Sequence, residues 1–182
     1  MSLAFTPERW QHVKATYRKW WRGELDRPIV PVVVQNRDPG RPKPDAPLLD
    51  QSNCADLTVP VEALIDRIDY ELSTCRFLGD AFPHFNMLCF GPGVVGAFLG
   101  GILDNSTGRV WFHPPKNCQI QDIHFRFDPD NVWFRRISQI YAAGMKRWQG
   151  QVLMGMTAAD WWRSAARTAR RAGARNCPTN RS

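Results

Sequence analysis

The sequence predicts an α/β fold in which helices cover a parallel sheet. Three observations lead to this prediction: long amphipathic helices alternate with short apolar runs, the first of these runs is β-branched and lacks polar alternation, and the elements follow one another as helix, strand, loop, helix, strand, short helix, excursion, helix and strand. Alternation of this kind is typical of parallel strands joined by helical crossovers.

The first helix is expected from Pro7 to about Arg22. Thr6 suits the N-cap, proline suits the first helical position, and Gly23 ends the helix. Apolar residues recur at spacings of three and four, which predicts a stripe buried in the core. The members of this stripe are Trp10, Val13, Tyr17, Trp20 and Trp21.

A first strand is expected over residues 28–35, where the β-branched run predicts a strand buried on both faces of a parallel sheet. The Pro-rich segment 36–45 that follows is a long loop, and such loops are often functional or mobile. A second amphipathic helix is expected over 60–75.

The second half of the chain repeats this alternation. A short apolar helix is expected over 94–99, and extended pieces over 109–112 and 119–127. A third long helix is expected from an Asp128 cap to Gly150, and a buried strand over 152–156 follows it.

Length limits which α/β architecture is available. A (β/α)8 barrel takes about 250 residues, so the roughly 157 residues before the composition changes are too few to close one, although they are enough for its first strands. An open doubly wound sheet also fits this length. No GxGxxG follows the first strand, however, which argues against a dinucleotide-binding version.

The composition changes abruptly near Thr157, which divides the chain into residues 1–157 and a tail of residues 158–182. The tail holds six Arg and one Asp and has no Leu, Ile, Val, Phe or Met. Three interpretations are open: a basic tail that binds nucleic acid or acidic lipid, a disordered extension, and a change of reading frame in GC-rich DNA. We favour the third.

Charge and cysteine content limit the functional classes. The net charge is +7, but the tail carries +5 of it, which weakens the case for a nucleic-acid-binding protein. Binding of nucleic acid or an anionic surface through the Arg-rich tail remains the alternative function. The five cysteines are scattered without CxxC spacing, which favours reduced thiols and a cytoplasmic location. We see no run of 18 apolar residues and no secretory signal, so no membrane association is expected.

Several segments together resemble the N-terminal part of uroporphyrinogen decarboxylase-like proteins, a superfamily that includes corrinoid-dependent methyltransferases. These segments are WWRGELDRP at 20–28, FLGDAFP at 77–83, FGPG at 90–93, AFLG at 97–100, VWF at 110–112 and GMT at 155–157. The resemblance covers roughly residues 7–157 and stops at the tail.

The resemblance implies an incomplete (β/α)8 TIM barrel with an extra N-terminal helix. It implies a fragment of an enzyme that either decarboxylates a tetrapyrrole side chain or transfers a methyl group from a methylated compound to a corrinoid protein. The zinc site of the methyltransferases, built from His and Cys, lies mostly in the second half of the barrel. We therefore expect no metal or cofactor in this fragment, no catalysis by it alone, and self-association through exposed sheet edges.

The resemblance also nominates site residues. It makes Asp80 the comparable residue to an Asp that contacts pyrrole N–H groups in the decarboxylases, although Asp beside Gly79 is also common in turns. It makes Arg37 and Arg41 candidates for pairing with substrate carboxylates, as in the Arg-rich segment of the decarboxylases. A solvated loop is the alternative for both arginines.

Four further candidates come from the stretch between residues 79 and 93. His84 is an acid/base candidate, although a lone His among aromatic residues is more often structural. Phe82 is a candidate to contact substrate, as are Gly91 and Gly93, whose turn lets the backbone approach a ligand. No His/Cys/Asp cluster has the tight spacing of a metal site.

Overall fold

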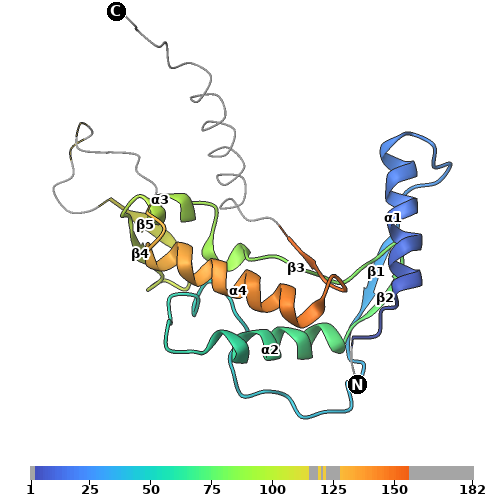
Figure 1. Ribbon diagram of the computed structural model, residues 1–182, viewed down its shortest axis with the longest axis horizontal. Helices are drawn as coiled ribbons and strands as arrows, with labels where there is room; N and C mark the ends of the chain where they lie inside the picture. Colours follow the sequence, from blue (N-terminus) through green and yellow to red (C-terminus); the bar gives the residue numbers. More distant parts are fainter. Residues whose placement is uncertain (1–2, 115–118, 120, 122–127, 156–182) are drawn as a thin grey trace, which may run out of the picture.

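The computed structural model describes residues 3–114, 119, 121 and 128–155. Its elements are α1 (Pro7–Trp21), β1 (Pro31–Val34), α2 (Val61–Ser73), β2 (Arg76–Gly79), β3 (His84–Phe85), η1 (Leu88–Phe90), α3 (Val94–Phe98), β4 (Ile102–Asp104), β5 (Trp111–His113), α4 (Val132–Trp148) and β6 (Leu153–Met154). In Figure 1, α1 stands at one end beside β1 and β2, α2 and α4 lie side by side in the middle, and α3 lies with β4 and β5 at the other end.

The described part is mixed α/β with three two-stranded sheets, none of which closes into a barrel. β1 pairs with β2 and β4 with β5, both antiparallel, whereas β3 and β6 are parallel. The connection from β3 to β6 includes α4, which packs beside β6. Besides α4, this connection contains η1, α3 and the β4–β5 hairpin. The tail at 158–182 and nearly all of the extended piece expected at 119–127 lie outside the described residues.

The bounds of the first helix are confirmed, but the buried stripe expected along it is wrong at its C-terminal end, where Trp20 and Trp21 are 44% and 78% exposed. The Thr6 hydroxyl accepts a hydrogen bond from the Arg9 N–H at 3.2 Å, and α1 runs from Pro7 to Trp21. Gly23 follows with a φ of +69°, a conformation that favours glycine. Sequence patterning was sufficient here because the cap, the first-turn proline and the terminating glycine all agree.

The expectation for the first strand is wrong in two respects. β1 pairs antiparallel with β2, and all four of its residues are exposed. Since hydrogen bonds alternate along an antiparallel pair, the bond of 3.0 Å from the Asp80 N–H to the Val30 carbonyl puts Pro31 and Val33 on the free edge. Pro31 lacks an N–H and is tolerated there. An apolar run alone does not distinguish this edge strand from a buried parallel one.

The cap of α4 also differs from the expectation. Asn131, not Asp128, is the N-cap, because its side-chain oxygen accepts from the N–H groups of Trp133 at 3.1 Å and Phe134 at 3.2 Å. Asp128 lies in the turn before the helix and accepts from the Asp130 N–H at 2.9 Å. Both residues suit a cap, so the sequence locates the helix start only to within a turn.

The core joins α2 to α4. Leu64, Ile65 and Ile68 of α2 are buried, as are Ile137 and Ile140 of α4. Full burial of such a side chain stabilises a protein by about 1.5–3 kcal/mol.

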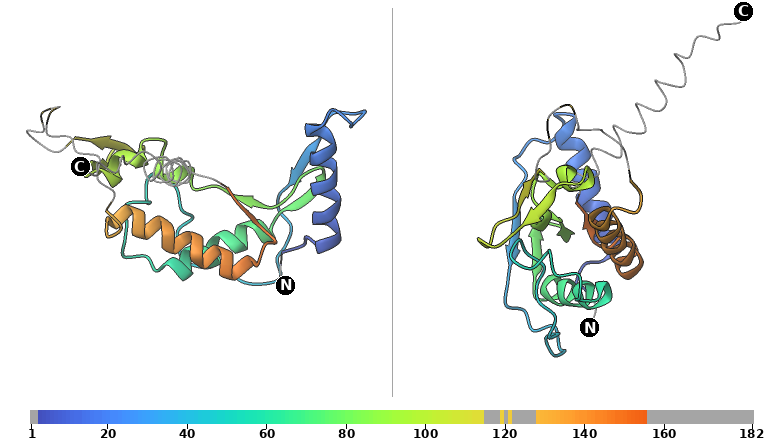
Figure 2. Two further views of the ribbon diagram at one scale, coloured as in Figure 1. Left: turned by 45° about the horizontal axis from the view of Figure 1, so that its top comes forward. Right: turned by 90° about the vertical axis from the view of Figure 1, so that its left-hand side faces the viewer.

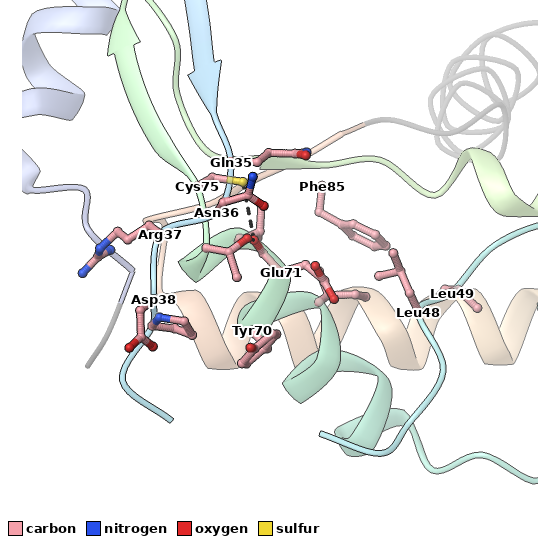
Figure 3. Close-up of a pocket in the computed structure, with 14 residues that line it drawn as sticks. Gln35, Asn36, Arg37, Asp38, Leu48, Leu49, Tyr70, Glu71, Cys75 and Phe85 are labelled. Carbon is pink, nitrogen blue, oxygen red and sulfur yellow. Dashed lines mark hydrogen bonds between the residues drawn. The ribbon is translucent and has the colours of Figure 1, made fainter. Parts of the chain in front are cut away.

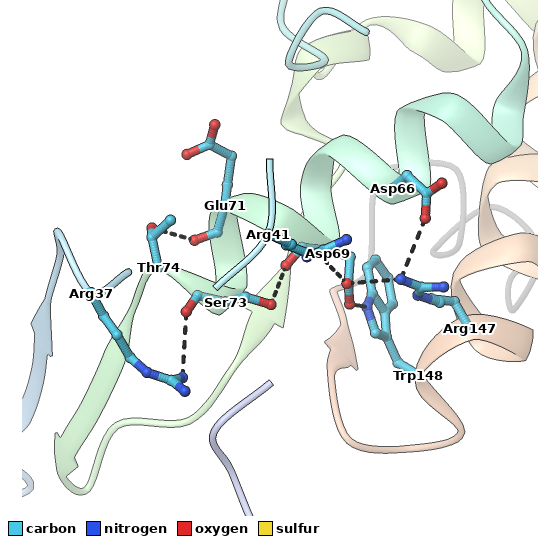
Figure 4. Close-up of polar contacts among 9 residues, drawn as sticks. All are labelled: Arg37, Arg41, Asp66, Asp69, Glu71, Ser73, Thr74, Arg147 and Trp148. Atoms are coloured by element: carbon cyan, nitrogen blue, oxygen red, sulfur yellow. Dashed lines mark hydrogen bonds and ion pairs between the residues drawn. The ribbon is translucent and has the colours of Figure 1, made fainter. Parts of the chain in front are cut away.

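The two helices are also joined by Asp69, a buried carboxylate of α2 (Figure 4). It accepts from the indole Nε1 of Trp148 at 2.9 Å, from the Arg147 guanidinium at 3.0 Å and from the Arg41 guanidinium at 2.6 Å. The first two donors belong to α4 and the third to the Pro-rich loop. One carboxylate therefore holds three segments that are distant in sequence.

We predict that Asp69→Ala lowers the free energy of unfolding by about 3 kcal/mol, because it leaves the buried indole N–H of Trp148 and the Arg41 guanidinium without their acceptor and removes one of the two carboxylates that pair with Arg147. Asp66→Ala is the matched control. Its more exposed carboxylate pairs with Arg147 at 3.4 Å, and an exposed pair contributes about 1 kcal/mol or less. Urea denaturation measures both changes. Equal effects of the two substitutions would contradict the role of Asp69.

We also predict that the chain self-associates. The exposed large apolar residues of the three strands β1, β2 and β6 are Val32, Val33, Val34, Leu78 and Leu153. Uncovered strands with apolar side chains favour pairing between copies. Sedimentation velocity over a dilution series should show species heavier than the 20.9 kDa monomer. A monomer at every concentration with a sharp cooperative melt would contradict this.

Candidate functional site

Asp80 follows β2 at a turn that only glycine permits. Gly79 has a φ of +58°, and a Cβ there would lie 2.3 Å from the Val30 carbonyl oxygen. This close approach of two backbone segments brings the Asp80 side chain beneath the loop that enters β1. Asp80 is 1% exposed.

The Asp80 carboxylate is fully engaged by its own chain. Arg27 pairs with it through both terminal nitrogens, at 2.6 Å and 2.8 Å, and the Val30 N–H donates to it at 2.8 Å. The hydrogen bonds from Arg27 are the largest cause that lowers the pKa of Asp80, to about 2. A bidentate pair of this kind is strong and geometrically specific. The structure thus places Asp80 as the anchor of residues 27–30.

Phe82 also supports the N-terminal helix. Its ring lies 5.3 Å from the Trp10 ring and 5.5 Å, edge-on, from the Tyr17 ring. Aromatic pairs at such distances stabilise packing beyond their area burial. On its other side Phe82 lies 5.9 Å from the His84 ring. Phe82 therefore joins α1 to the start of β3.

The two candidate arginines separate in the structure. Arg41 pairs with Asp69 (Figure 4), and its guanidinium carbon lies 5.6 Å from the Tyr70 ring centroid. Arg37 donates to the Ser73 carbonyl at 3.4 Å and lines a cavity of about 660 Å³ (Figure 3). The cavity lies between the end of β1, the C-terminal half of α2 and Phe85 of β3. Of the pair, only Arg37 lines this cavity, and Figure 3 shows its guanidinium directed away from Glu71 and Phe85.

The Gly91-Pro92-Gly93 turn packs against the β4–β5 hairpin. A Cβ at Gly93 would lie 3.0 Å from the Phe112 ring, and Gly91 has a φ of +66° beside Val110. These glycines let the hairpin approach the turn before α3. Their contacts in the structure are therefore with other parts of the chain.

The residues of β3 and the residue after it lie on two different faces of the strand. Phe85 lies 6.3 Å, ring to ring, from Trp148 of α4, so it faces the helices. Successive side chains of a strand point to opposite faces, so His84 and Asn86 lie on the face turned away from the helices. Both are exposed, as is Leu153, the partner of His84 in β6, at 49%.

Asn86 is the residue that sequence reasoning missed. It stands just beyond the carboxyl end of β3, and its Cβ would lie 3.2 Å from a Cβ built on Gly155, which follows β6. The carboxyl ends of two parallel strands meet there, which is where α/β sheets bind ligands. Once residues 84–85 are known to form a strand, the alternation of polar His84, apolar Phe85 and polar Asn86 before the Gly-Pro-Gly turn is the signal that identifies Asn86.

The described residues contain no group of three His, Cys, Asp or Glu side chains that fits a metal ion. Two cysteines are buried, and burial raises the pKa of Cys54 to about 11 and that of Cys89 to about 12. Both thiols are thus protonated near neutral pH and are poor nucleophiles or ligands. Among the described helices, none is long and apolar enough to cross a membrane.

Comparison of the chain with protein-family models, with curated proteins and with solved structures finds no match. The likeness to uroporphyrinogen decarboxylase-like proteins therefore rests on the short segments of the sequence itself. The further argument for a functional site comes from how the structure arranges the residues described above.

We predict that the ion pair of Asp80 makes stability depend on pH. Its pKa is lowered from 3.8 to about 2 in the folded chain, so its contribution is present above pH 3.8 and is lost as the pH falls toward 2. Asp80→Asn should be less stable than wild type at neutral pH, and the difference in Tm should shrink over this interval. Asp45→Asn, which removes an exposed carboxylate, is the control. A difference that is constant with pH would contradict the prediction.

Proposed function

We propose that this chain is the N-terminal portion of a uroporphyrinogen decarboxylase-like barrel enzyme. The observation that carries the proposal is the face of the parallel pair β3 and β6 turned away from α4. His84 lies exposed on this face, and Asn86 lies exposed just beyond the carboxyl end of β3. In a closed barrel this face would be the interior, and the carboxyl ends would form the substrate cleft. The matched segments 77–83 and 90–93 flank these two residues.

His84 and Asn86 suit the substrates that the resemblance implies. An imidazole exchanges protons near neutral pH and can act as a general acid or base. An asparagine amide both donates and accepts hydrogen bonds, so it can orient a carboxylate or a pyrrole N–H. Asp80 is assigned to the support of residues 27–30, because its carboxylate is occupied by Arg27 and Val30.

The reaction is either decarboxylation of a tetrapyrrole side chain or corrinoid-dependent methyl transfer. The described residues carry two of the inward-facing groups and no metal cluster. We expect this chain to bind the substrate or the corrinoid without turning it over, because the other strands of a barrel would supply the remaining groups.

We predict that uroporphyrin III or methylcobalamin, each tested alone, quenches the tryptophan fluorescence of the chain saturably. His84→Ala and Asn86→Ala should each raise the Kd about tenfold, which corresponds to about 1.4 kcal/mol. His113→Ala is the matched control, since this His lies on β5 and, among the described residues, pairs with Asp104 at 3.6 Å. Absence of binding by both probes, or equal Kd values for all variants, would contradict the proposal.

A further inference from the structure

The outer side of α1 carries a compact basic surface around an exposed tryptophan. From residue 9 to residue 22 the chain has five Lys or Arg and no acid. Lys14, Arg18 and Arg22 recur at spacings of four, so they lie along one side of the helix, about 6 Å apart along its axis. Trp21 lies within the same stripe. We call Lys14, Arg18, Trp21 and Arg22 the α1 stripe.

Within the part of the chain that the structure describes, all four residues of the α1 stripe are exposed. The opposite side of α1 buries Val13 and Thr16, while Trp10 and Tyr17 contact Phe82. Figures 1 and 2 show α1 at one end of the molecule, away from α3 and the β4–β5 hairpin. Packing thus fixes which side of the helix faces outward.

Trp21 is the most exposed large apolar residue of the described chain, at 78%. Trp20 lies edge-on against it, with ring centroids 5.0 Å apart and an interplanar angle of 73°. This neighbour restrains one side of the indole and leaves most of the ring accessible. A restrained, exposed ring is a suitable platform for stacking with another flat ring.

The cations beside Trp21 have no acidic partners within the described ranges. No ion pair joins Lys14, Arg18 or Arg22 to a carboxylate. Lys14 instead places its ammonium 5.4 Å from the Trp10 ring centroid. Uncompensated positive charge along a helix attracts a polyanion.

We propose that the α1 stripe binds single-stranded nucleic acid, with Trp21 stacking on an unpaired base and the three cations contacting phosphates. An exposed aromatic ring combined with a basic track is the arrangement that binds single strands without sequence preference. A lipid surface fits less well, because an interfacial helix lies on its apolar side, and here that side is buried. The proposal is independent of the barrel and of the tail at 158–182.

The test is fluorescence anisotropy with a labelled oligothymidine and the full chain. Trp21→Ala should weaken binding about fivefold or more, and Trp21→Phe should retain most of the affinity, because stacking survives. The triple variant Lys14→Gln, Arg18→Gln, Arg22→Gln should reduce the slope of log K against log salt concentration by about 2. Every variant keeps residues 158–182, so any contribution of those arginines is common to all.

The matched control is Lys43→Gln, Arg135→Gln, Lys146→Gln, which removes the same charge from exposed cations elsewhere. It should lose clearly less affinity than the α1 triple variant, and the Tm of the α1 variants should equal that of wild type. The proposal is overturned if the α1 variants bind oligothymidine as wild type does, or if the control loses as much. It is also overturned if the α1 variants lose binding only to phosphatidylserine vesicles or polyglutamate.

Discussion

The buried carboxylate of Asp69 is the interaction on which the arrangement of the molecule depends. It holds the indole of Trp148 at the end of α4, and that indole in turn lies against Phe85 of β3. The chain then turns at once into β6, whose Leu153 N–H donates to the Pro83 carbonyl at 2.9 Å. Fixing the end of α4 therefore fixes β6 beside β3. A carboxylate with three donors from separate segments is also a specific constraint, because few other packings would satisfy all of them.

The N-terminal helix α1 is held by two further hydrogen bonds. The indole N–H of Trp10 donates to the Gln151 carbonyl at 2.7 Å, in the turn between α4 and β6. The Arg9 guanidinium donates to the carbonyl of Gly79 at the end of β2. The helix is thus joined both to the crossover and to the β1–β2 pair, and its outward side is determined by these contacts. The basic stripe and the strand pair belong to one connected structure.

Local signals in the sequence predicted the elements better than their partners. The start of α1 followed from Thr6 and Pro7 because a cap is a contact within one turn. The burial and direction of β1 did not follow, since they depend on β2, which lies more than forty residues away. Pairing between distant strands is set by tertiary contacts that a short apolar run does not encode.

At the candidate site, too, the sequence indicated residue types, whereas their positions depend on long-range contacts. His84 was identified from its residue type, and its position on the face turned away from α4 became evident only when Phe85 was found against Trp148. Asn86 was missed because a lone amide carries no pattern of its own. Asp80 was nominated by likeness to a motif, and the structure places it beneath Arg27, a partner 53 residues earlier in the chain. An ion pair between residues this far apart in the sequence cannot be predicted from the local spacing of residue types.

The central claim is that residues 7–155 begin a barrel whose remaining strands would cover the exposed face of β3 and β6. The most direct test is to resequence the source DNA across the codons around Thr157 and to translate all three frames downstream. The account predicts that another frame continues with alternating strands and amphipathic helices. A confirmed frame with the other two closed by stop codons would contradict it.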